Sequence, residues 1–220
     1  MKQKFILLDI DNTLYDSSSF RKKLFEKVIK ILEKLGCKDG EKLCDEVYSR
    51  LIKEKGLFYP EDFIEALQLQ VVDTPLPKEQ LLHSMYDGSF ASAYLYAETH
   101  AIVKEFKKIG ELGIFSQGME KFQRLKVKQI AHLFKDHHVH IVPNKLSEFS
   151  KIFETYNKYD FFFLDDSLPI LHAAKKAYPD IFTVWVKRGR YAMKQEPISN
   201  FIPDATVLTL KEAERILRKK

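Results

Sequence analysis

The sequence contains few cysteines and no long apolar segment. Its two cysteines, Cys37 and Cys44, form neither a Cys-x-x-Cys pair nor a disulfide framework. No stretch approaches the roughly 18 apolar residues that a transmembrane helix needs. The short apolar run near the N-terminus is interrupted by Asp9 and has no signal-peptide pattern. We therefore expect a cytoplasmic protein with reduced thiols and no membrane partner.

The sequence also lacks a basic cluster. Lys and Arg number 36 against 31 Asp and Glu, which gives a formal charge of +5. This excess is spread along the chain without an interleaved aromatic stripe, so no nucleic acid polymer is expected as a partner. Mild positive charge would suit a small phosphorylated metabolite.

Apolar periodicity predicts an alternation of strands and helices outside one long helical block. With 220 residues, 45% of them hydrophobic, the chain can bury a substantial core. Continuous apolar or β-branched runs predict strands at 5–8, 112–115, 139–142, 161–164, 182–186 and 206–208. Helical spacing predicts helices at 20–35, 43–52, 60–71, 77–86, 89–96, 101–109, 120–134, 148–156, 168–178 and from 211 onward. The first of these has Ser17–Ser19 as candidate N-caps and Gly36 as its stop.

This order of elements predicts an α/β protein with a doubly wound, parallel, Rossmann-like sheet. Residues 16–96 contain predicted helices and no convincing strand, so they form an all-helical insertion after the first strand. The predicted domains are therefore a core of residues 1–15 and 97–220 and an inserted helical domain of residues 16–96.

Polar residues follow four of the predicted strands. In an open parallel sheet, binding sites form beyond the carboxyl ends of the strands, so these side chains should converge on one rim. They are Asp9 and Asp11, then Ser116, then Asn144 and Lys145, and finally Asp165 and Asp166.

The Asp-x-Asp pair at the end of the first strand indicates a cation. Strand side chains alternate, so Asp9 and Asp11 point the same way and repel each other. Mg²⁺ prefers a few carboxylates together with phosphate oxygens, and Asp166 is the natural third carboxylate. A calcium-binding EF-hand loop is excluded, because its Gly and Glu positions hold Leu14 and Phe20.

Four segments in this order resemble the motifs of the haloacid dehalogenase-like (HAD) hydrolase superfamily, over nearly the whole chain. They are Asp9-Ile10-Asp11-Asn12-Thr13, then Ile114-Phe115-Ser116, then Lys145, and finally the apolar strand ending in Asp165-Asp166-Ser167. The helical insertion is similar to the α-helical cap that some members carry between the first two motifs.

The resemblance implies a Mg²⁺-dependent phosphatase that acts on a small phosphate monoester. Asp9 would form an aspartyl-phosphate, and Asp11 would act as general acid and base. Mg²⁺ would be held by the side chains of Asp9 and Asp166 and the backbone carbonyl of Asp11. The residues expected to bind the substrate phosphate are Asn12, Thr13, Ser116, Gln117 and Lys145.

Several assignments stay open at this point. Lys151 is the rival of Lys145 as the phosphate-binding lysine. Asp165 could orient that lysine or lie near the start of the following helix. Members of the superfamily often carry a further acidic residue just beyond, where this chain has Pro169 and Ile170, so one metal-supporting contact is in doubt.

The function also has alternatives. A phosphomutase would use the same residues, and the segment Asp9–Tyr15 is similar to that of pyrimidine 5′-nucleotidase-like members. A 2-haloacid dehalogenase would not need Asp11 as acid and base. A receiver-like phospho-acceptor would carry its acceptor on a middle strand and would lack the helical insertion, and an inactive relative would be expected to have lost Asp9 or Asp11.

Other features of the sequence carry weaker expectations. The candidates to face the leaving group are Tyr15, Asp16, Phe20 and Arg21. Phe58 or Tyr59 could stack on a nucleobase, although aromatic residues near a helix start more often belong to the core of the helical domain. The tract His137, His138 and His140 lacks helical metal-ligand spacing and reads as a polar loop. Arg188-Gly189-Arg190-Tyr191 reads as a basic turn, and Trp185 as a core residue.

Overall fold

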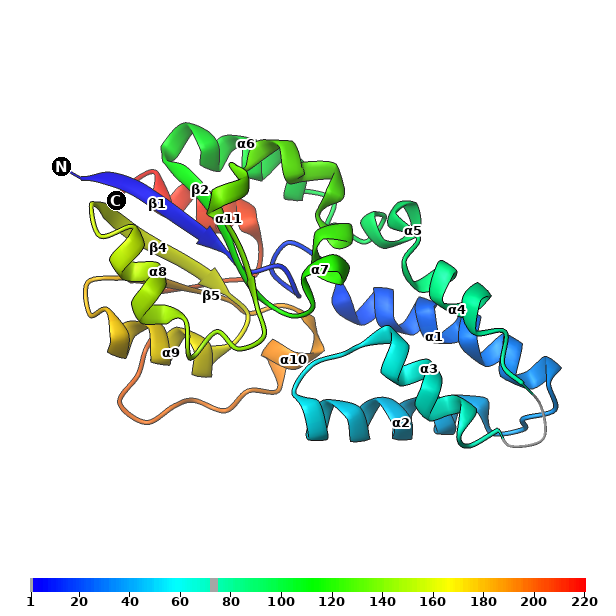
Figure 1. Cartoon of the computed structure of the whole chain (residues 1–220). Coiled ribbons are helices and arrows are strands. Elements are labelled where there is room, and N and C mark those ends of the chain that lie inside the picture. Colours follow the sequence, from blue (N-terminus) through cyan, green and yellow to red (C-terminus); the bar gives the residue numbers. More distant parts are fainter. Residues whose placement is uncertain (1, 72–74) are drawn as a thin grey trace.

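The computed structural model describes residues 2–71 and 75–220 and shows a parallel sheet beside a group of helices (Figure 1). The strands are β1 (Gln3–Leu8), β2 (Glu111–Gln117), β3 (Val139–Val142), β4 (Tyr159–Asp165), β5 (Phe182–Val186) and β6 (Ala205–Val207). They lie in the order β3-β2-β1-β4-β5-β6, and all pairs are parallel. The predicted doubly wound α/β fold is confirmed.

Helices cover both faces of this sheet. The core helices are α6 (Thr99–Ile109), α7 (Glu120–Lys126), α8 (Phe149–Thr155), α9 (Leu168–Ala177), α10 (Gly189–Met193) and α11 (Leu210–Leu217), with the 3₁₀ helices η1 (Lys128–Leu133) and η2 (Asp136–His138). Because strand side chains alternate, Ile6 and Leu8 pack with the cluster that contains α6 and α11. Phe5 and Leu7 pack with the cluster that contains α8 and α9.

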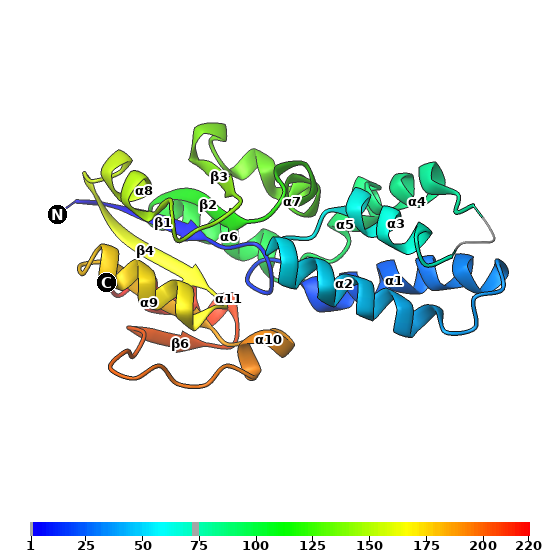
Figure 2. The same ribbon diagram turned by 60° about the horizontal axis from the view of Figure 1, so that its bottom comes forward.

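The helical insertion consists of α1 (Ser17–Lys34), α2 (Gly40–Lys55), α3 (Pro60–Gln68), α4 (Lys78–Met85) and α5 (Gly88–Ser92). These helices lie beyond the end of β1, to one side of the sheet (Figures 1 and 2). Helix α1 buries Phe20, Leu24, Phe25, Val28 and Leu32, which share one face. Its end was predicted at Gly36, and Gly36 has a left-handed φ of 87° just after the helix.

The two connections between insertion and core run side by side. The backbone N–H of Asp16 donates to the carbonyl of Tyr94 at 2.9 Å, and that of Tyr96 donates to the carbonyl of Leu14 at 3.1 Å. Tyr15 and Leu95 form an antiparallel bridge between these bonds. This pairing limits the predicted helix 89–96 to α5, because the chain from Ala93 onward is needed for the crossing.

The structure corrects three further local predictions. The predicted helix 120–134 ends at Lys126 and continues as η1, where Val127, Ile130 and Leu133 are buried with a spacing of three that suits a 3₁₀ helix. Asp16, rather than one of the following serines, caps α1 by accepting from Ser19 N at 3.0 Å.

The third correction concerns the stretch expected to be a basic turn. It contains α10, whose first residue, Gly189, has a left-handed φ of 76°. A Cβ at this position would lie 3.0 Å from the Asn12 side chain, so the close approach of this helix to the loop after β1 depends on glycine.

No helix in residues 2–71 and 75–220 combines the length and hydropathy needed to cross a bilayer.

Candidate functional site

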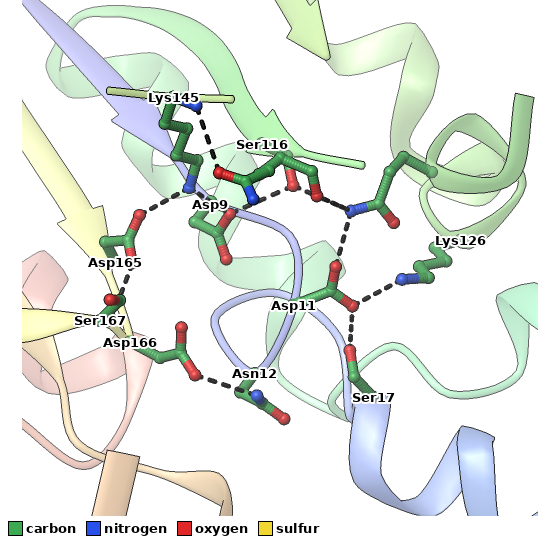
Figure 3. A network of polar contacts seen from close by, with 12 residues as sticks. Asp9, Asp11, Asn12, Ser17, Ser116, Lys126, Lys145, Asp165, Asp166 and Ser167 are labelled. Atoms are coloured by element: carbon green, nitrogen blue, oxygen red, sulfur yellow. Dashed lines mark hydrogen bonds and ion pairs between the residues drawn. The ribbon is translucent and has the colours of Figure 1, made fainter. Parts of the chain in front are cut away.

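The structure brings the polar ends of four strands together at one rim of the sheet (Figure 3). Asp9 follows β1, and its backbone N–H donates to the carbonyl of Leu164 in β4 at 2.9 Å. Ser116 lies in β2, Lys145 follows β3, and Asp165 ends β4. The side chains of these four residues are all nearly inaccessible to solvent.

Lys145 bridges two carboxylates. Its Nζ lies 2.5 Å from Asp9 Oδ1 and 2.6 Å from Asp165 Oδ2. Lys151, the rival in the sequence, is largely exposed and pairs only with Glu148 at 3.9 Å. The structure therefore places Lys145, and not Lys151, beside Asp9. Gln117 supports this loop, because its Oε1 accepts from the backbone N–H of Lys145 at 3.2 Å.

Asp165 fulfils both alternatives that the sequence left open. Its Oδ2 holds Lys145, and its Oδ1 accepts from the backbone N–H of Ser167 at 2.8 Å, just before α9. Because both of its oxygens accept hydrogen bonds, the Asp165 carboxylate is well suited to fix the position of Lys145. Trp185 is buried as predicted, and its indole N–H donates to the backbone carbonyl of Asp166 at 3.0 Å.

The described residues provide a group of oxygen ligands for a hard cation. One carboxylate oxygen each from Asp9, Asp165 and Asp166 lies within 4.8 Å of the others, and all three residues are buried. Lys145 pairs with Asp9 and Asp165, and no cation among the described residues pairs with Asp166, which leaves a buried excess of negative charge. This set of ligands fits Mg²⁺, which favours carboxylate oxygens and compensates such repulsion.

The pKa values around this cluster reflect the same excess. Burial raises the pKa of Asp9 to about 7, and the nearby Asp165 and Asp11 act in the same direction, while Lys145 opposes them. Burial, Asp165 and Asp9 likewise raise the pKa of Asp166 well above its usual range. Two of the three carboxyl groups are therefore ionised only at a cost that a cation would remove.

Asp11 lies in different surroundings, although it is two residues from Asp9. Its Oδ1 accepts from Lys126 Nζ at 2.6 Å and from the Ser17 hydroxyl, and its Oδ2 accepts from Gln123 Nε2 at 2.6 Å. Burial alone would raise its pKa, but Lys126 and the other donors outweigh this and lower it. Figure 3 shows Asp11 facing α1 and α7, away from Lys145.

These three donors were missed by the sequence prediction. Gln123 and Lys126 are three residues apart on the helix after the Ser116 strand, and both are buried. Their spacing places them on one helix face, but polar surface residues show the same spacing. Ser17 lies in the serine run that had been assigned to capping. No signal in the sequence separates these roles.

The loop between the two carboxylates and α1 is held in an unusual conformation. Asn12 has a φ of 55°, and its Nδ2 donates to Asp166 Oδ2 at 2.9 Å. Asparagine tolerates this left-handed region better than most residues. The buried Asn12 Oδ1 and Thr13 Oγ1 have no partner among the described residues, and of these two residues only Asn12 lines the cavity described below.

Arg188, which lies between β5 and α10, holds this loop in place. Its guanidinium donates to the backbone carbonyls of Asn12, at 3.2 Å, and of Thr13, and it pairs with Glu98 at 2.7 Å. It also lies 3.6 Å from the centre of the Tyr96 ring. Arg188 therefore positions the loop, and its donors are already engaged by protein acceptors.

A cavity of about 540 Å³ opens between this loop and the helical insertion. Asp11, Asn12 and Gln117 form its wall on the side of the sheet. Of the residues expected to face the leaving group or to stack on a base, Phe20, Arg21 and Phe58 line it. Tyr15, Asp16 and Tyr59 do not: Tyr15 is fully buried and donates to the carbonyl of Ala91, and Tyr59 precedes α3.

Two histidines of the tract His137, His138 and His140 have hydrogen-bond partners within the protein. His138 Nδ1 lies 3.1 Å from the carbonyl of Leu112, and His140 Nε2 lies 2.8 Å from the Tyr156 hydroxyl. Pro169 lies in the first turn of α9.

No protein-family model matches the chain, and no curated protein matches it in sequence. Its structure is similar to that of a protein assigned to the haloacid dehalogenase-like hydrolases from Burkholderia xenovorans LB400. The TM-score is 0.79 at 24% identity, over 100% of this chain and 98% of the other. The chain has the HAD-like fold.

Two other solved structures show the range of proteins with this fold. The HAD hydrolase YfnB from Bacillus subtilis, solved with bound magnesium, has a TM-score of 0.63 at 15% identity, over 99% of each chain. The L-2-haloacid dehalogenase from Xanthobacter autotrophicus, solved with covalently bound chloropropionic acid, has a TM-score of 0.63 at 14% identity, again over 99% of each chain. The resemblance predicted from the four motifs is thus confirmed at the level of the fold.

Proposed function

We propose that this protein is a HAD-type hydrolase, specifically a Mg²⁺-dependent phosphatase that hydrolyses a small phosphate monoester. The main support for the proposal is that the carboxylates of Asp9 and Asp11 have different surroundings. Asp9 lies in a buried cluster of acids served by Lys145, whereas Asp11 forms part of the cavity wall. A dehalogenase has no need of a carboxylate in the second position, and a phosphatase does.

Asp9 is the proposed nucleophile. Its carboxylate attacks the phosphorus, an Asp9–phosphate bond forms, and the bond between phosphorus and the leaving oxygen breaks. Lys145 Nζ, 2.5 Å from Asp9, holds this carboxylate and offers positive charge to the phosphoryl oxygens. Ser116 Oγ, which donates to Asp9 Oδ1 at 3.1 Å, would turn to a phosphoryl oxygen.

Asp11 is the proposed proton carrier. It gives a proton to the leaving oxygen, and later takes one from the water that attacks the phosphorus and releases phosphate from Asp9. Because Lys126, Gln123 and Ser17 now hold Asp11 ionised, Asp11 must give up at least one of these donors and take up a proton from water before it can protonate the leaving oxygen. Lys126 then remains as a cation beside the leaving group.

Mg²⁺ would be held by Asp9, Asp166 and the backbone carbonyl of Asp11. When bound, it would shield the phosphate from the anionic nucleophile and favour the ionised form of Asp9. The helices α1–α5 would act as the cap that encloses the leaving group, since α1, α2 and the loop after α2 supply much of the cavity wall.

A screen for phosphate release tests the proposal. Nucleoside monophosphates, sugar phosphates and phospho-amino acids are incubated with the protein in Mg²⁺ or in EDTA. We expect release from at least one class, dependent on Mg²⁺ and abolished in Asp9→Asn. The exposed Asp160→Asn, on β4 but outside the cluster, is the matched control.

Two other outcomes would overturn or refine it. Release of halide from 2-haloacids in EDTA, without release of phosphate, would identify a dehalogenase and overturn the proposal. Transfer of the phosphoryl group to a sugar hydroxyl instead of water would identify a phosphomutase, which uses the same residues.

A further inference from the structure

The cavity beside Asp11 has an unequal distribution of charge. Four basic residues line it, Arg21, Lys126, Arg190 and Lys194. Among the described residues that line it, Asp11 alone is acidic, and Lys126 already neutralises this carboxylate at 2.6 Å. The whole chain has 36 basic and 31 acidic residues, so the excess in the cavity is local.

The three remaining cations are exposed and lack an acidic partner within the part of the chain that the structure describes. Arg21 stacks on the ring of Tyr48, with 4.7 Å from its guanidinium carbon to the ring centre, and no carboxylate pairs with it. Arg190 and Lys194 belong to α10 and the residue just after it, and neither forms an ion pair. Arginine forks of this kind bind carboxylates and phosphates in two-pronged geometry.

These cations come from two parts of the molecule. Arg21 lies on α1 of the insertion, whereas Arg190 lies on α10 of the core and Lys194 directly follows it. Apolar rings, among them Phe20, Phe58 and Phe122, line the same cavity. A ligand that fills about 540 Å³ therefore meets Asp11, apolar rings and three cations without an acidic partner among the described residues.

We propose that the substrate carries a second anionic group, a carboxylate or a further phosphate, on an apolar leaving group, and that Arg21, Arg190 and Lys194 bind this group. This inference rests on the proposed phosphatase function and specifies its substrate class. Clustered cations without anions repel one another, and a bound anion removes that repulsion. Because Arg21 belongs to the insertion whereas Arg190 and Lys194 belong to the core, the second anion also links the insertion to the core.

A series of aromatic phosphates tests the inference. Phenyl phosphate has a single anionic group, 4-carboxyphenyl phosphate adds a carboxylate, and 1,4-phenylene bisphosphate adds a phosphate. In the wild type we expect kcat/KM to be higher by about tenfold or more for at least one of the two substrates with a second anion, mainly through a lower KM. The two substrates distinguish a carboxylate from a phosphate, and the preference should weaken with added salt.

The double variant Arg190→Gln/Lys194→Gln should bring that ratio towards one. Its matched control is Arg215→Gln/Lys219→Gln, an Arg and a Lys with the same spacing of four, both exposed and outside the cavity, which should keep the wild-type ratio. A ratio near one in the wild type, or an unchanged ratio in the Arg190/Lys194 variant, would overturn the inference.

Calorimetric binding separates this inference from the proposed function. The Asp9→Asn protein, which cannot form the aspartyl-phosphate, is titrated with the same three compounds in Mg²⁺. Tighter binding of a substrate with a second anion, lost when Arg190 and Lys194 are also replaced, supports the inference even if no phosphate is released by the wild type. Equal binding of all three compounds contradicts it, whatever the activity.

Discussion

Asp9 and Asp11 are the same residue type two positions apart, yet the fold gives them opposite surroundings. The partners of Asp9 come from the strands of the core: Lys145 after β3, Asp165 at the end of β4 and Ser116 in β2. The partners of Asp11 come from helices: Lys126 and Gln123 from α7 and Ser17 from α1. The chemistry of each carboxylate is thus set by which elements reach it.

The pKa values of Asp9 and Asp11 are shifted in opposite directions because Lys145 and Lys126 are surrounded by different numbers of carboxylates. Lys145 is shared by Asp9 and Asp165 with Asp166 nearby, and the pKa of Asp9 is raised. Lys126 serves Asp11 alone, with two neutral donors in addition, and the pKa of Asp11 is lowered. The surplus of buried negative charge around Asp9 favours the binding of a cation there. The charge of Asp11 is already compensated by Lys126.

The largest expected effect is the loss of the nucleophile. Asp9→Asn should lower kcat by about 10⁴-fold or more, because a neutral amide cannot form the phosphoenzyme. Asp11→Asn should lower it by about 10²- to 10⁴-fold, the usual contribution of acid–base catalysis. Steady-state phosphate release measures both, with Asp160→Asn as the control. Comparable activity in Asp9→Asn and wild type would exclude Asp9 as nucleophile.

The two lysines should differ in their contribution to stability. Lys145→Met leaves Asp9 and Asp165 buried without a cation, which should lower the free energy of unfolding by about 3–5 kcal/mol. Lys126→Met leaves Asp11, whose side chain is 31% exposed, with two donors, and should cost about 1 kcal/mol. Urea unfolding in EDTA measures the free energy of unfolding of both variants. Equal losses would contradict the expected difference between the two lysines.

A divalent cation should stabilise one carboxylate site and not the other. At 100 times its Kd, Mg²⁺ should raise the free energy of unfolding by about 2.7 kcal/mol in the wild type. Asp166→Asn should lose most of this gain. Asp11→Asn should retain most of it, because Asp11 is expected to offer only its backbone carbonyl. Thermal melts with Mg²⁺ and with EDTA measure the difference, and an equal loss in both variants would show that the Asp11 carboxylate is a ligand.

The smallest expected effect lies away from both carboxylates. His138 is buried, and burial, together with the neighbouring His137, lowers its pKa below the ordinary 6.5. The unfolded chain then binds the proton more readily, so this contribution to stability is present above pH 6.5 and is lost as the pH falls below it. Melting temperatures between pH 5 and 8 should show this decline in the wild type and less of it in His138→Gln. A pH dependence identical in both would assign the decline to other groups.

Backbone-driven features could be predicted from the sequence, and contacts between distant side chains could not. The apolar runs of β1 and β4 and the acids that follow them predict the sheet and the meeting of Asp9 with Asp166, because parallel strands align their carboxyl ends. The choice of Lys145 over Lys151 rested on its position directly after a strand, and its contacts agree.

The contacts of Asp11 could not be predicted from the sequence, and the reason is physical. Lys126 and Gln123 lie on α7, and they reach Asp11 because α7 packs beside the loop after β1 and against the insertion. This packing leaves no distinct local pattern in the sequence. The role of Asp11 as general acid is the part of the proposed mechanism that these contacts alter most, since Asp11 must first lose a donor and take up a proton.

The most direct test of the account is to trap the phosphoenzyme. The wild type, turning over its best phosphate ester in Mg²⁺, is quenched in acid and its peptides are analysed by mass spectrometry. We predict a phosphoryl group on the peptide that contains Asp9, labile to hydroxylamine and absent from Asp9→Asn and from samples in EDTA. Steady release of phosphate with no phosphorylated Asp9 peptide, or with the phosphoryl group on another residue, would contradict the central claim.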